Sequence, residues 1–352
     1  MSYVNKIEVK KLRHLEDISI EVGGKNLIIT GSNGSGKTSF MEKLNIFFSN
    51  RQGYILAGND AIVDLSDPNI IDKLYTYLPA LRQNQFNEPR KIERVYLSHN
   101  IKYTDFLKYM VILRHDMLEA NFSGDRDAGN DLQTWFDRFE NTLKEVFNDD
   151  TLKLIYTAKE LSFKIKLNGR DPVIFNQLSH GYSSFLKIVM EIIIKMEAKN
   201  SKDYNLPGIV LIDEVEIHLH IEMQKKIMPF LTQMFPNIQF IVTTHSPFVI
   251  NSLSNAVIYD LEKQQTFENL SAYSYEGVIE YYYGVQQYSK EAIQKFEDYK
   301  SLVEKEELIG DDEERLIEAL RFLKSIPLNV APEIVVQFRT MERKRAEGKR
   351  YG

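Results

Sequence analysis

Residues 31–38 constrain most strongly what this chain can fold into. They read Gly-Ser-Asn-Gly-Ser-Gly-Lys-Thr, after an apolar run at 26–30 and before a helical pattern at about 37–48. A glycine-rich turn between a strand and a helix directs backbone N–H groups toward phosphate oxygens. In this pattern the lysine reaches the terminal phosphates and the hydroxyl ligates Mg²⁺. The residues expected at a nucleotide are Gly31, Ser32, Asn33, Gly34, Ser35, Gly36, Lys37, Thr38 and Ser39.

Two carboxylates follow a second apolar run, at 209–212. Such a run is typical of a buried parallel strand, which places Asp213 and Glu214 at its carboxyl end. An acid at a strand end can hold the metal of a nucleotide, usually through water, and we expect this of Asp213. Glu214 would orient and polarise the attacking water, as a positioned carboxylate does.

Two further features suit phosphate chemistry. Ser179 and Gly181 precede an amphipathic helix at 183–196, so the serine and the following helix N-terminus form a second anion site. The phosphate loop of the same chain does not need this second anion site. We therefore expect Ser179 to act on the γ-phosphate held by a partner copy. His245 ends another apolar, β-branched run, at 239–244, where it can hydrogen-bond a γ-phosphate.

These motifs, in this order and spacing, resemble the ABC ATPase heads of RecF, SMC and OLD-family proteins. They correspond to Walker A (31–38), signature (178–182), Walker B (209–214) and switch histidine (245), and the resemblance covers about residues 1–260. Arg13, after the first strand, is similar to the adenine-side segment of RecF and SMC heads. Residues 215–220 look like the D-loop, which crosses the dimer. The resemblance implies an ATPase that binds ATP and Mg²⁺ in a head-to-tail sandwich dimer, with Lys37, Glu214 and His245 as catalytic residues.

Three positions depart from the family pattern. His180 replaces the glycine of transporter signatures, which argues against a transporter, and Ile221 stands where many relatives have proline. No glutamine is clearly the Q-loop residue that would contact the metal. Gln83 and Gln85 are the candidates, and Gln83 joins Thr38 and Asp213 in the expected metal set. His218 and His220 could suggest a separate metal site, although the D-loop interpretation already accounts for them.

The rest of the chain narrows the class. No long heptad segment interrupts the head, so it is no SMC rod, and residues 250–352 lack the strand-end acids of a Toprim nuclease domain. The C-terminal extension, with Ser-Tyr-Glu-Gly-Val-Ile-Glu at 274–280 ahead of it, looks like that of the stand-alone ATPases of anti-phage systems such as Septu. That likeness implies a separate nuclease of the HNH type. Two alternatives stay open: a RecF-like DNA repair or recombination ATPase, and a nucleotide-dependent scaffold with negligible turnover.

Composition limits the partners and the location. The formal net charge is −6, so any DNA contact must come from a local patch. The clearest basic cluster is the C-terminal tail, and a solvated, frayed helix end explains it better than phosphate contact does. The chain has no cysteine, no apolar signal segment at its start and no run of 18 or so apolar residues. We expect a cytoplasmic protein without a membrane contact.

The expected architecture is α/β: an ABC-type P-loop NTPase head at 1–290, with a helical insertion at about 98–150 and a helical C-terminal extension at 291–352. Residues 50–72 look loop-rich, and a strand is expected at 92–97. In the extension, Leu316, Ile317, Leu320 and Leu323 are expected to form one apolar stripe.

Overall fold

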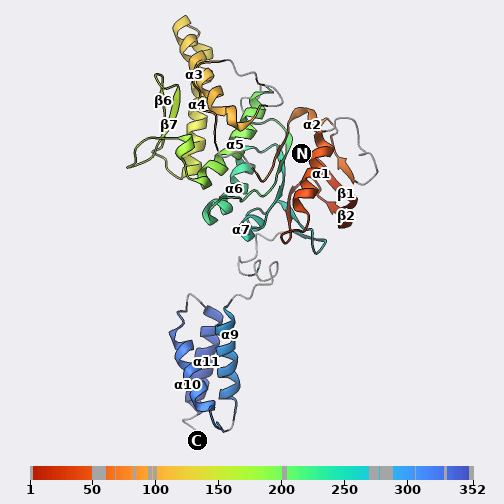
Figure 1. Ribbon diagram of the computed structural model, residues 1–352, viewed down its shortest axis with the longest axis vertical. Coiled ribbons are helices and arrows are strands. Elements are labelled where there is room, and N and C mark those ends of the chain that lie inside the picture. The colour runs from red at the N-terminus through yellow and green to blue at the C-terminus, as the bar shows by residue number, and fades with distance from the viewer. Residues whose placement is uncertain are drawn as a thin grey trace. The chain divides into compact units, whose positions relative to one another are not determined.

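The computed structural model divides into two compact units, residues Met1–Tyr275 and Glu276–Gly352 (Figure 1). It describes residues 3–49, 61–67, 69–81, 85–93, 97, 101–199, 204–268, 277, 288–305, 307–328 and 331–348. The division falls ahead of the boundary expected near 290, where α9 begins. Along the described residues, no helix is both long enough and apolar enough to cross a membrane.

A sheet of six strands forms the centre of the first unit, in the order β12-β11-β3-β10-β9-β5. Its strands are β3 (Asn26–Thr30), β5 (Tyr75–Leu78), β9 (Gly208–Ile212), β10 (Ile238–Thr243), β11 (Ala256–Asp260) and β12 (Gln265–Glu268). Neighbouring strands are parallel except β11 and β12. The residues of β9 and β10 are all buried, as continuous apolar strands covered on both faces should be.

Helices cover both faces of this sheet. The principal ones are α1 (Lys37–Ser49), α5 (His180–Glu197) and α6 (Ile221–Met234), with the short α2 (Ile70–Lys73) and α7 (Pro247–Ile250). Figure 1 shows α1 on one side of the sheet and α5 and α6 on the other. This arrangement confirms the expected α/β P-loop architecture.

A smaller antiparallel sheet packs beside α1. It has the order β2-β1-β4 and consists of β1 (Val4–Leu12), β2 (Leu15–Glu21) and β4 (Ala61–Leu65). Its buried aliphatic residues form one core with the apolar face of α1. β4 lies within residues 50–72, where the sequence predicted a loop-rich segment and no strand. Ala61 and Val63 are buried while Ile62 is exposed, and an alternation this short gives a weak signal.

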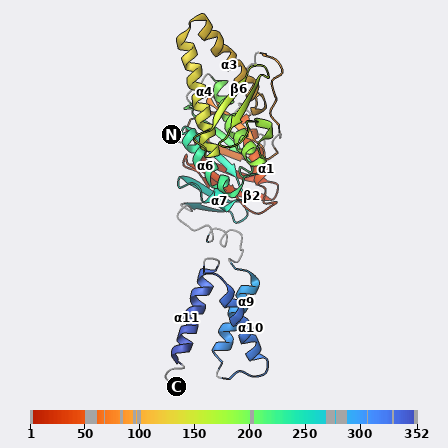
Figure 2. The ribbon, with the colours of Figure 1, turned by 90° about the vertical axis from the view of Figure 1, so that its left-hand side faces the viewer.

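The expected helical insertion consists of η1 (Tyr103–Asp105), α3 (Phe106–Ser123) and α4 (Arg126–Phe147). The two long helices run side by side in both views (Figure 2). A three-stranded sheet follows, of β6 (Lys153–Thr157), β7 (Ser162–Lys166) and β8 (Val173–Ile174), before η2 (Phe175–Gln177) leads into α5.

Glu197, at the end of α5, binds the insertion to the head. Its carboxylate is buried and accepts hydrogen bonds from the Tyr109 hydroxyl of α3 (2.7 Å) and the Trp135 indole N–H of α4 (2.8 Å). At the other end of α5, the rings of Phe147 and Tyr182 stack with centroids 4.1 Å apart. The insertion is therefore fixed to both ends of the signature helix.

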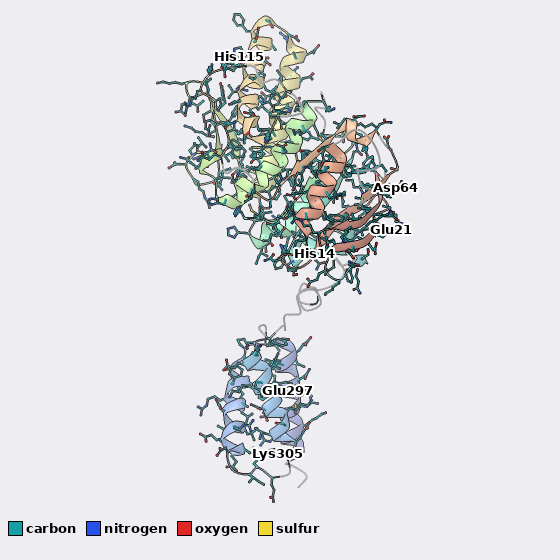
Figure 3. The ribbon with its side chains drawn as sticks, turned by 45° about the vertical axis from the view of Figure 1, so that its right-hand side comes forward. His14, Glu21, Asp64, His115, Glu297 and Lys305 are labelled. Atoms are coloured by element: carbon teal, nitrogen blue, oxygen red, sulfur yellow. The ribbon has the colours of Figure 1, made fainter. Side chains whose placement is uncertain are left out.

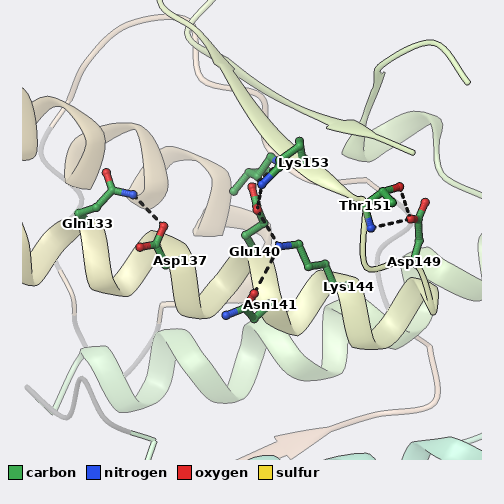
Figure 4. A network of polar contacts seen from close by, with 9 residues as sticks. Gln133, Asp137, Glu140, Asn141, Lys144, Asp149, Thr151 and Lys153 are labelled. Carbon is green, nitrogen blue, oxygen red and sulfur yellow. Dashed lines mark hydrogen bonds and ion pairs between the residues drawn. The ribbon is translucent and has the colours of Figure 1, made fainter. Parts of the chain in front are cut away.

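A polar network joins α4 to the β6 sheet (Figure 4). Glu140 accepts from Lys144 (3.0 Å) and Lys153 (3.1 Å), and its second oxygen accepts from the Leu154 N–H (2.9 Å). These hydrogen bonds lower the pKa of the Glu140 carboxyl against the opposing effect of burial. The network keeps the hairpin of β6 and β7 against the outer face of α4.

The second unit contains α9 (Lys290–Val303), α10 (Asp312–Ser325) and α11 (Pro332–Gly348). Three acids fill the first turn of α10, where the helix dipole favours negative charge. The expected stripe was partly wrong: Ile317 is 57% exposed, and Ala319 joins Leu316 and Leu323 in the core. Of the expected strand at 92–97, residues 92, 93 and 97 are described and are not in a strand.

Candidate nucleotide-binding site

The phosphate loop connects β3 to α1 at the carboxyl end of the large sheet. Gly31, Gly34 and Gly36 have φ angles of 143°, 86° and 98°, which residues other than glycine rarely adopt. A Cβ on Gly36 would also lie 2.8 Å from the Leu15 Cδ1, at the start of β2 directly after the β1–β2 turn. The glycines are therefore needed both for the backbone course and for the close approach of that turn.

The side chain of Lys37 folds back against the phosphate loop. Its Nζ donates to the carbonyl oxygens of Gly31 and Ser32, each at 2.9 Å. Burial lowers the pKa of the Lys37 ammonium, although nearby carboxylates oppose that shift. Those carboxylates belong to Glu214, Glu216, Asp213 and Asp260. The Lys37 cation thus lies near several carboxylates at the end of the sheet.

The β1–β2 turn lies against the phosphate loop. His14 Nε2 is 3.2 Å from the Ser35 carbonyl oxygen (His14 is labelled in Figure 3). Arg13, in the same turn, is exposed and has a φ of 56°. The side chains of Ser32, Asn33 and Thr38 are exposed, whereas Ser35, Lys37 and Ser39 are buried.

Thr243 organises the two strand-end carboxylates, although sequence reasoning did not single it out. It is fully buried at the end of β10, and its hydroxyl donates to Asp213 Oδ1 (2.5 Å). The hydroxyl oxygen of Thr243 also accepts a hydrogen bond from the Glu214 backbone N–H (2.8 Å). Glu214 has a φ of 47°, an uncommon conformation for a residue with a side chain. The sequence offered one signal for Thr243: it is a hydroxyl residue that ends an apolar strand two residues before His245.

His245 reaches the phosphate loop from the end of β10. It is half-buried and hydrogen-bonds the backbone of Gly31. Burial lowers the pKa of its imidazole, and the Lys37 cation lowers it further. The backbone N–H of His245 donates a hydrogen bond to Glu216 Oε1. Burial also raises the pKa of the Glu216 carboxyl, against the opposing effect of that hydrogen bond. The structure thus brings together Lys37, Asp213, Glu214 and His245.

The signature residues lie against the D-loop segment 215–220 rather than the phosphate loop. A Cβ on Gly181 would lie 3.3 Å from the His218 carbonyl oxygen and 3.3 Å from the Met223 Sδ. Ser179 is the N-cap of α5, and its exposed side chain makes no capping hydrogen bond within that described helix. The rings of His180 and His218 are 6.0 Å apart, and both residues are exposed.

The residues fit a nucleotide with its metal. The loop has open space over Gly34, and within the described residues the buried Ser35 hydroxyl has no hydrogen-bond partner. Thr38 and Asp213 offer oxygen ligands of the kind Mg²⁺ prefers. Gln83 lies outside the described residues, and Gln85 is exposed.

Among the described residues, His218 and His220 belong to no group of three or more side chains close enough to hold a metal ion. In the described part of the chain, a group with metal-ligand spacing comprises His115, Asp116 and Glu119, all exposed on α3 (Figure 3). It is remote in sequence from the phosphate-loop motifs.

The fold and this site define a P-loop ATPase of the ABC type. Residues 27–251 match the family described as "AAA domain, putative AbiEii toxin, Type IV TA system". Because the match spans well over half of the chain, this protein belongs to that family.

Relatives with curated names agree with this class. The chain is 34% identical over 151 residues to the retron Ec83 probable ATPase of Escherichia coli, and 22% identical over 296 residues to Septu protein PtuA of Bacillus thuringiensis. These matches cover 40% and 72% of this chain. They span 27% of the retron protein and 74% of PtuA. A solved SMC head bound to a winged-helix domain of ScpA aligns at TM-score 0.43 and 12% identity, over 75% of this chain and 96% of that one.

Proposed function

We propose that this chain is the regulatory ATPase of an anti-phage defence complex, and that it hydrolyses Mg-ATP between two copies of itself. The observation that carries the proposal is the meeting of Lys37, Asp213, Glu214 and His245 at one end of the sheet. Cation, metal-binding acid, water-orienting acid and phosphate-contacting histidine are the groups that phosphoryl transfer requires.

Each side chain has a role that its surroundings support. On nucleotide binding, the Lys37 ammonium would exchange the Gly31 and Ser32 carbonyls for phosphate oxygens. Thr38 and Asp213 would hold Mg²⁺, which neutralises charge on the phosphates when bound. Glu214 would orient the attacking water, with its backbone fixed through Thr243. His245 would donate to the γ-phosphate.

A second copy would complete the site. Ser179 and the N-terminus of α5 form an exposed donor set, and Gly181 lies beside the D-loop. In a head-to-tail sandwich, these groups of one copy close over the γ-phosphate held by Lys37 of the other. Binding of ATP would then control assembly, and hydrolysis would release it.

The defence role rests on the names of the relatives, two of which are a Septu protein and a retron ATPase. The effector in this proposal is a separate nuclease of the HNH type. DNA would be a further contact, and α11 carries four basic residues that could reach its phosphates. They are Arg339, Arg343, Lys344 and Arg345.

The ATPase is tested with Lys37→Ala and Glu214→Gln, with Glu222→Gln as the matched control on the exposed first turn of α6. We expect Lys37→Ala to lose ATP binding. Glu214→Gln should bind ATP, fail to hydrolyse it and accumulate as a dimer or larger assembly in light scattering. The control should behave as wild type. A Glu214→Gln protein that binds ATP but stays monomeric would refute the composite site, and wild-type turnover in Lys37→Ala would refute the phosphate-loop assignment.

The separate nuclease is tested by incubating the purified chain with plasmid, Mn²⁺ or Mg²⁺, and ATP. We expect no cleavage, because Asp213, Glu214 and His245 are engaged in ATP chemistry and cleavage of a phosphodiester commonly needs metal-held carboxylates or a histidine–metal centre. Cleavage that survives Glu214→Gln in a preparation free of other proteins would show a nuclease site within this chain.

A further inference from the structure

Glu216 lies in the D-loop segment, and its carboxylate hydrogen-bonds within its own chain. Oε1 accepts from the backbone N–H of His245, and the Thr244 hydroxyl also hydrogen-bonds the carboxylate. Oε2 is buried, and within the described residues it has no hydrogen-bond partner. A buried polar atom without a partner costs free energy, so the arrangement is retained at some expense to stability.

Gln224 makes a second connection between the same two segments. From the first turn of α6, its Nε2 donates to the Leu219 carbonyl (2.7 Å) at the end of the D-loop. Its Oε1 accepts from the Ser246 hydroxyl (2.6 Å). The Ser246 oxygen in turn accepts from the first N–H groups of α7, at Phe248 and Val249. Both polar ends of one amide are therefore used to hold the segments together.

The D-loop itself has little freedom to yield. Glu214, just before this segment, and His218 within it both have positive φ angles, and Gly181 of the signature lies directly against the His218 carbonyl. Backbone conformations of this kind persist where surrounding contacts determine them. A displacement of the D-loop would therefore be passed to residues 244–246 through Glu216 and Gln224.

We propose that Glu216 is a positioning residue that ties the backbone of His245 to the D-loop, with Gln224 as a second tie. The inference rests on the proposed function, in which the D-loop meets the partner copy and His245 meets the γ-phosphate. Closure of the partner onto the D-loop then places His245, so that one ATP site responds to the engagement of the other. Glu216 itself takes no part in proton transfer.

The test is a double-mutant cycle in the full-length protein. ATP dissociation constant, kcat, KM and melting temperature are measured for Glu216→Ala, His245→Ala, their double variant and Glu216→Gln. Glu222→Ala is the matched control, since Glu222 is exposed and pairs only with Lys225 among the described contacts. We expect Glu216→Ala to lower kcat about tenfold or more while the ATP dissociation constant stays within about twofold.

Two readouts separate positioning from other roles. If Glu216 acts through His245, the double variant has the kcat of His245→Ala within about threefold, because the second substitution has nothing left to remove. Glu216→Gln keeps kcat within a few fold of wild type, because the amide oxygen accepts the same His245 N–H. A glutamate that served as a base would instead lose turnover on change to glutamine, as predicted for Glu214→Gln.

The outcomes distinguish this inference from the proposed function. Multiplying losses in the double variant, or loss of turnover in Glu216→Gln with an unchanged melting temperature, would overturn the positioning role. If His245→Ala itself leaves kcat unchanged, the proposed role of His245 fails first. If Glu216→Ala unfolds, Glu216→Gln and Gln224→Ala carry the test, and wild-type kcat in Gln224→Ala would remove the second tie.

Discussion

Replacing Thr243 by valine tests whether one buried hydroxyl holds both strand-end carboxylates. Valine keeps the size and β-branching but removes the donor to Asp213 Oδ1 and the acceptor for the Glu214 N–H. A hydrogen bond to a charged group contributes about 1.5–3 kcal/mol, and a buried N–H left without a partner costs about 1–3 kcal/mol. The additional methyl group returns about 0.8 kcal/mol. We expect the free energy of unfolding to fall by roughly 2–5 kcal/mol.

The same change should reduce catalysis through Glu214. Its backbone has a φ of 47° and loses its fixed partner, so the carboxylate no longer holds water in line with the phosphate. Misplacement by about 1 Å can cost on the order of a hundredfold in rate. We therefore expect kcat to fall by about 10–100-fold, with ATP affinity nearly unchanged because Lys37 and the loop are untouched.

Denaturant unfolding and steady-state ATP turnover are the assays. Thr243→Ser should recover most of both losses, since serine restores the hydroxyl. Thr232→Val is the matched control, because Thr232 is half-buried and its hydroxyl bonds only carbonyls of its own helix among the described contacts, Met228 (2.9 Å) and Pro229 (3.0 Å). Wild-type stability and turnover in Thr243→Val would refute the assignment of Thr243 as the organiser of the carboxylates.

Three further substitutions test other parts of the structure. Ser179→Arg should abolish ATP-driven association in sizing experiments while the monomer still binds ATP, because its bulk lies at the exposed end of α5. Trp135→Phe should lower the free energy of unfolding by about 1–3 kcal/mol, measured by circular dichroism, because Glu197 loses a buried donor. Gly208→Ala should destabilise by about 1–3 kcal/mol in the same assay, since the new Cβ would lie 2.6 Å from the Leu74 carbonyl oxygen. Unchanged behaviour in any of them would contradict the contact concerned.

The sequence predicted those parts of the fold that carry periodic or motif signals. The strands at 26–30 and 209–212, the phosphate loop and the amphipathic helix before Met196 all lie where expected, because long apolar runs and glycine turns are local properties. β4 was missed because its alternation is short. Ile317 was misplaced because the apolar pattern did not reveal where the packed face of the helix is centred: that face runs through Leu316, Ala319 and Leu323 and leaves Ile317 exposed.

The candidate site divides in the same way. Residues at strand ends, such as Asp213 and His245, could be placed because the carboxyl ends of parallel strands meet at one edge. Thr243, Glu216 and Gln224 could not, since each acts through a hydrogen bond whose partner is distant in the sequence or depends on the turn of the backbone. Such pairs have no characteristic spacing, and their importance becomes visible only when the chain is folded.

The attachment of the insertion to α5 has a practical consequence for experiments that trim the protein. Glu197 receives donors from both α3 and α4, and Tyr182 of the signature stacks on Phe147. Removing the two helices would leave a carboxylate in an apolar interior without those donors, and it would strip the aromatic cover from the start of α5. The insertion is therefore not a detachable module. Loss of ATP turnover in such a deletion would report damage to α5, whether or not the helices α3 and α4 bind anything themselves.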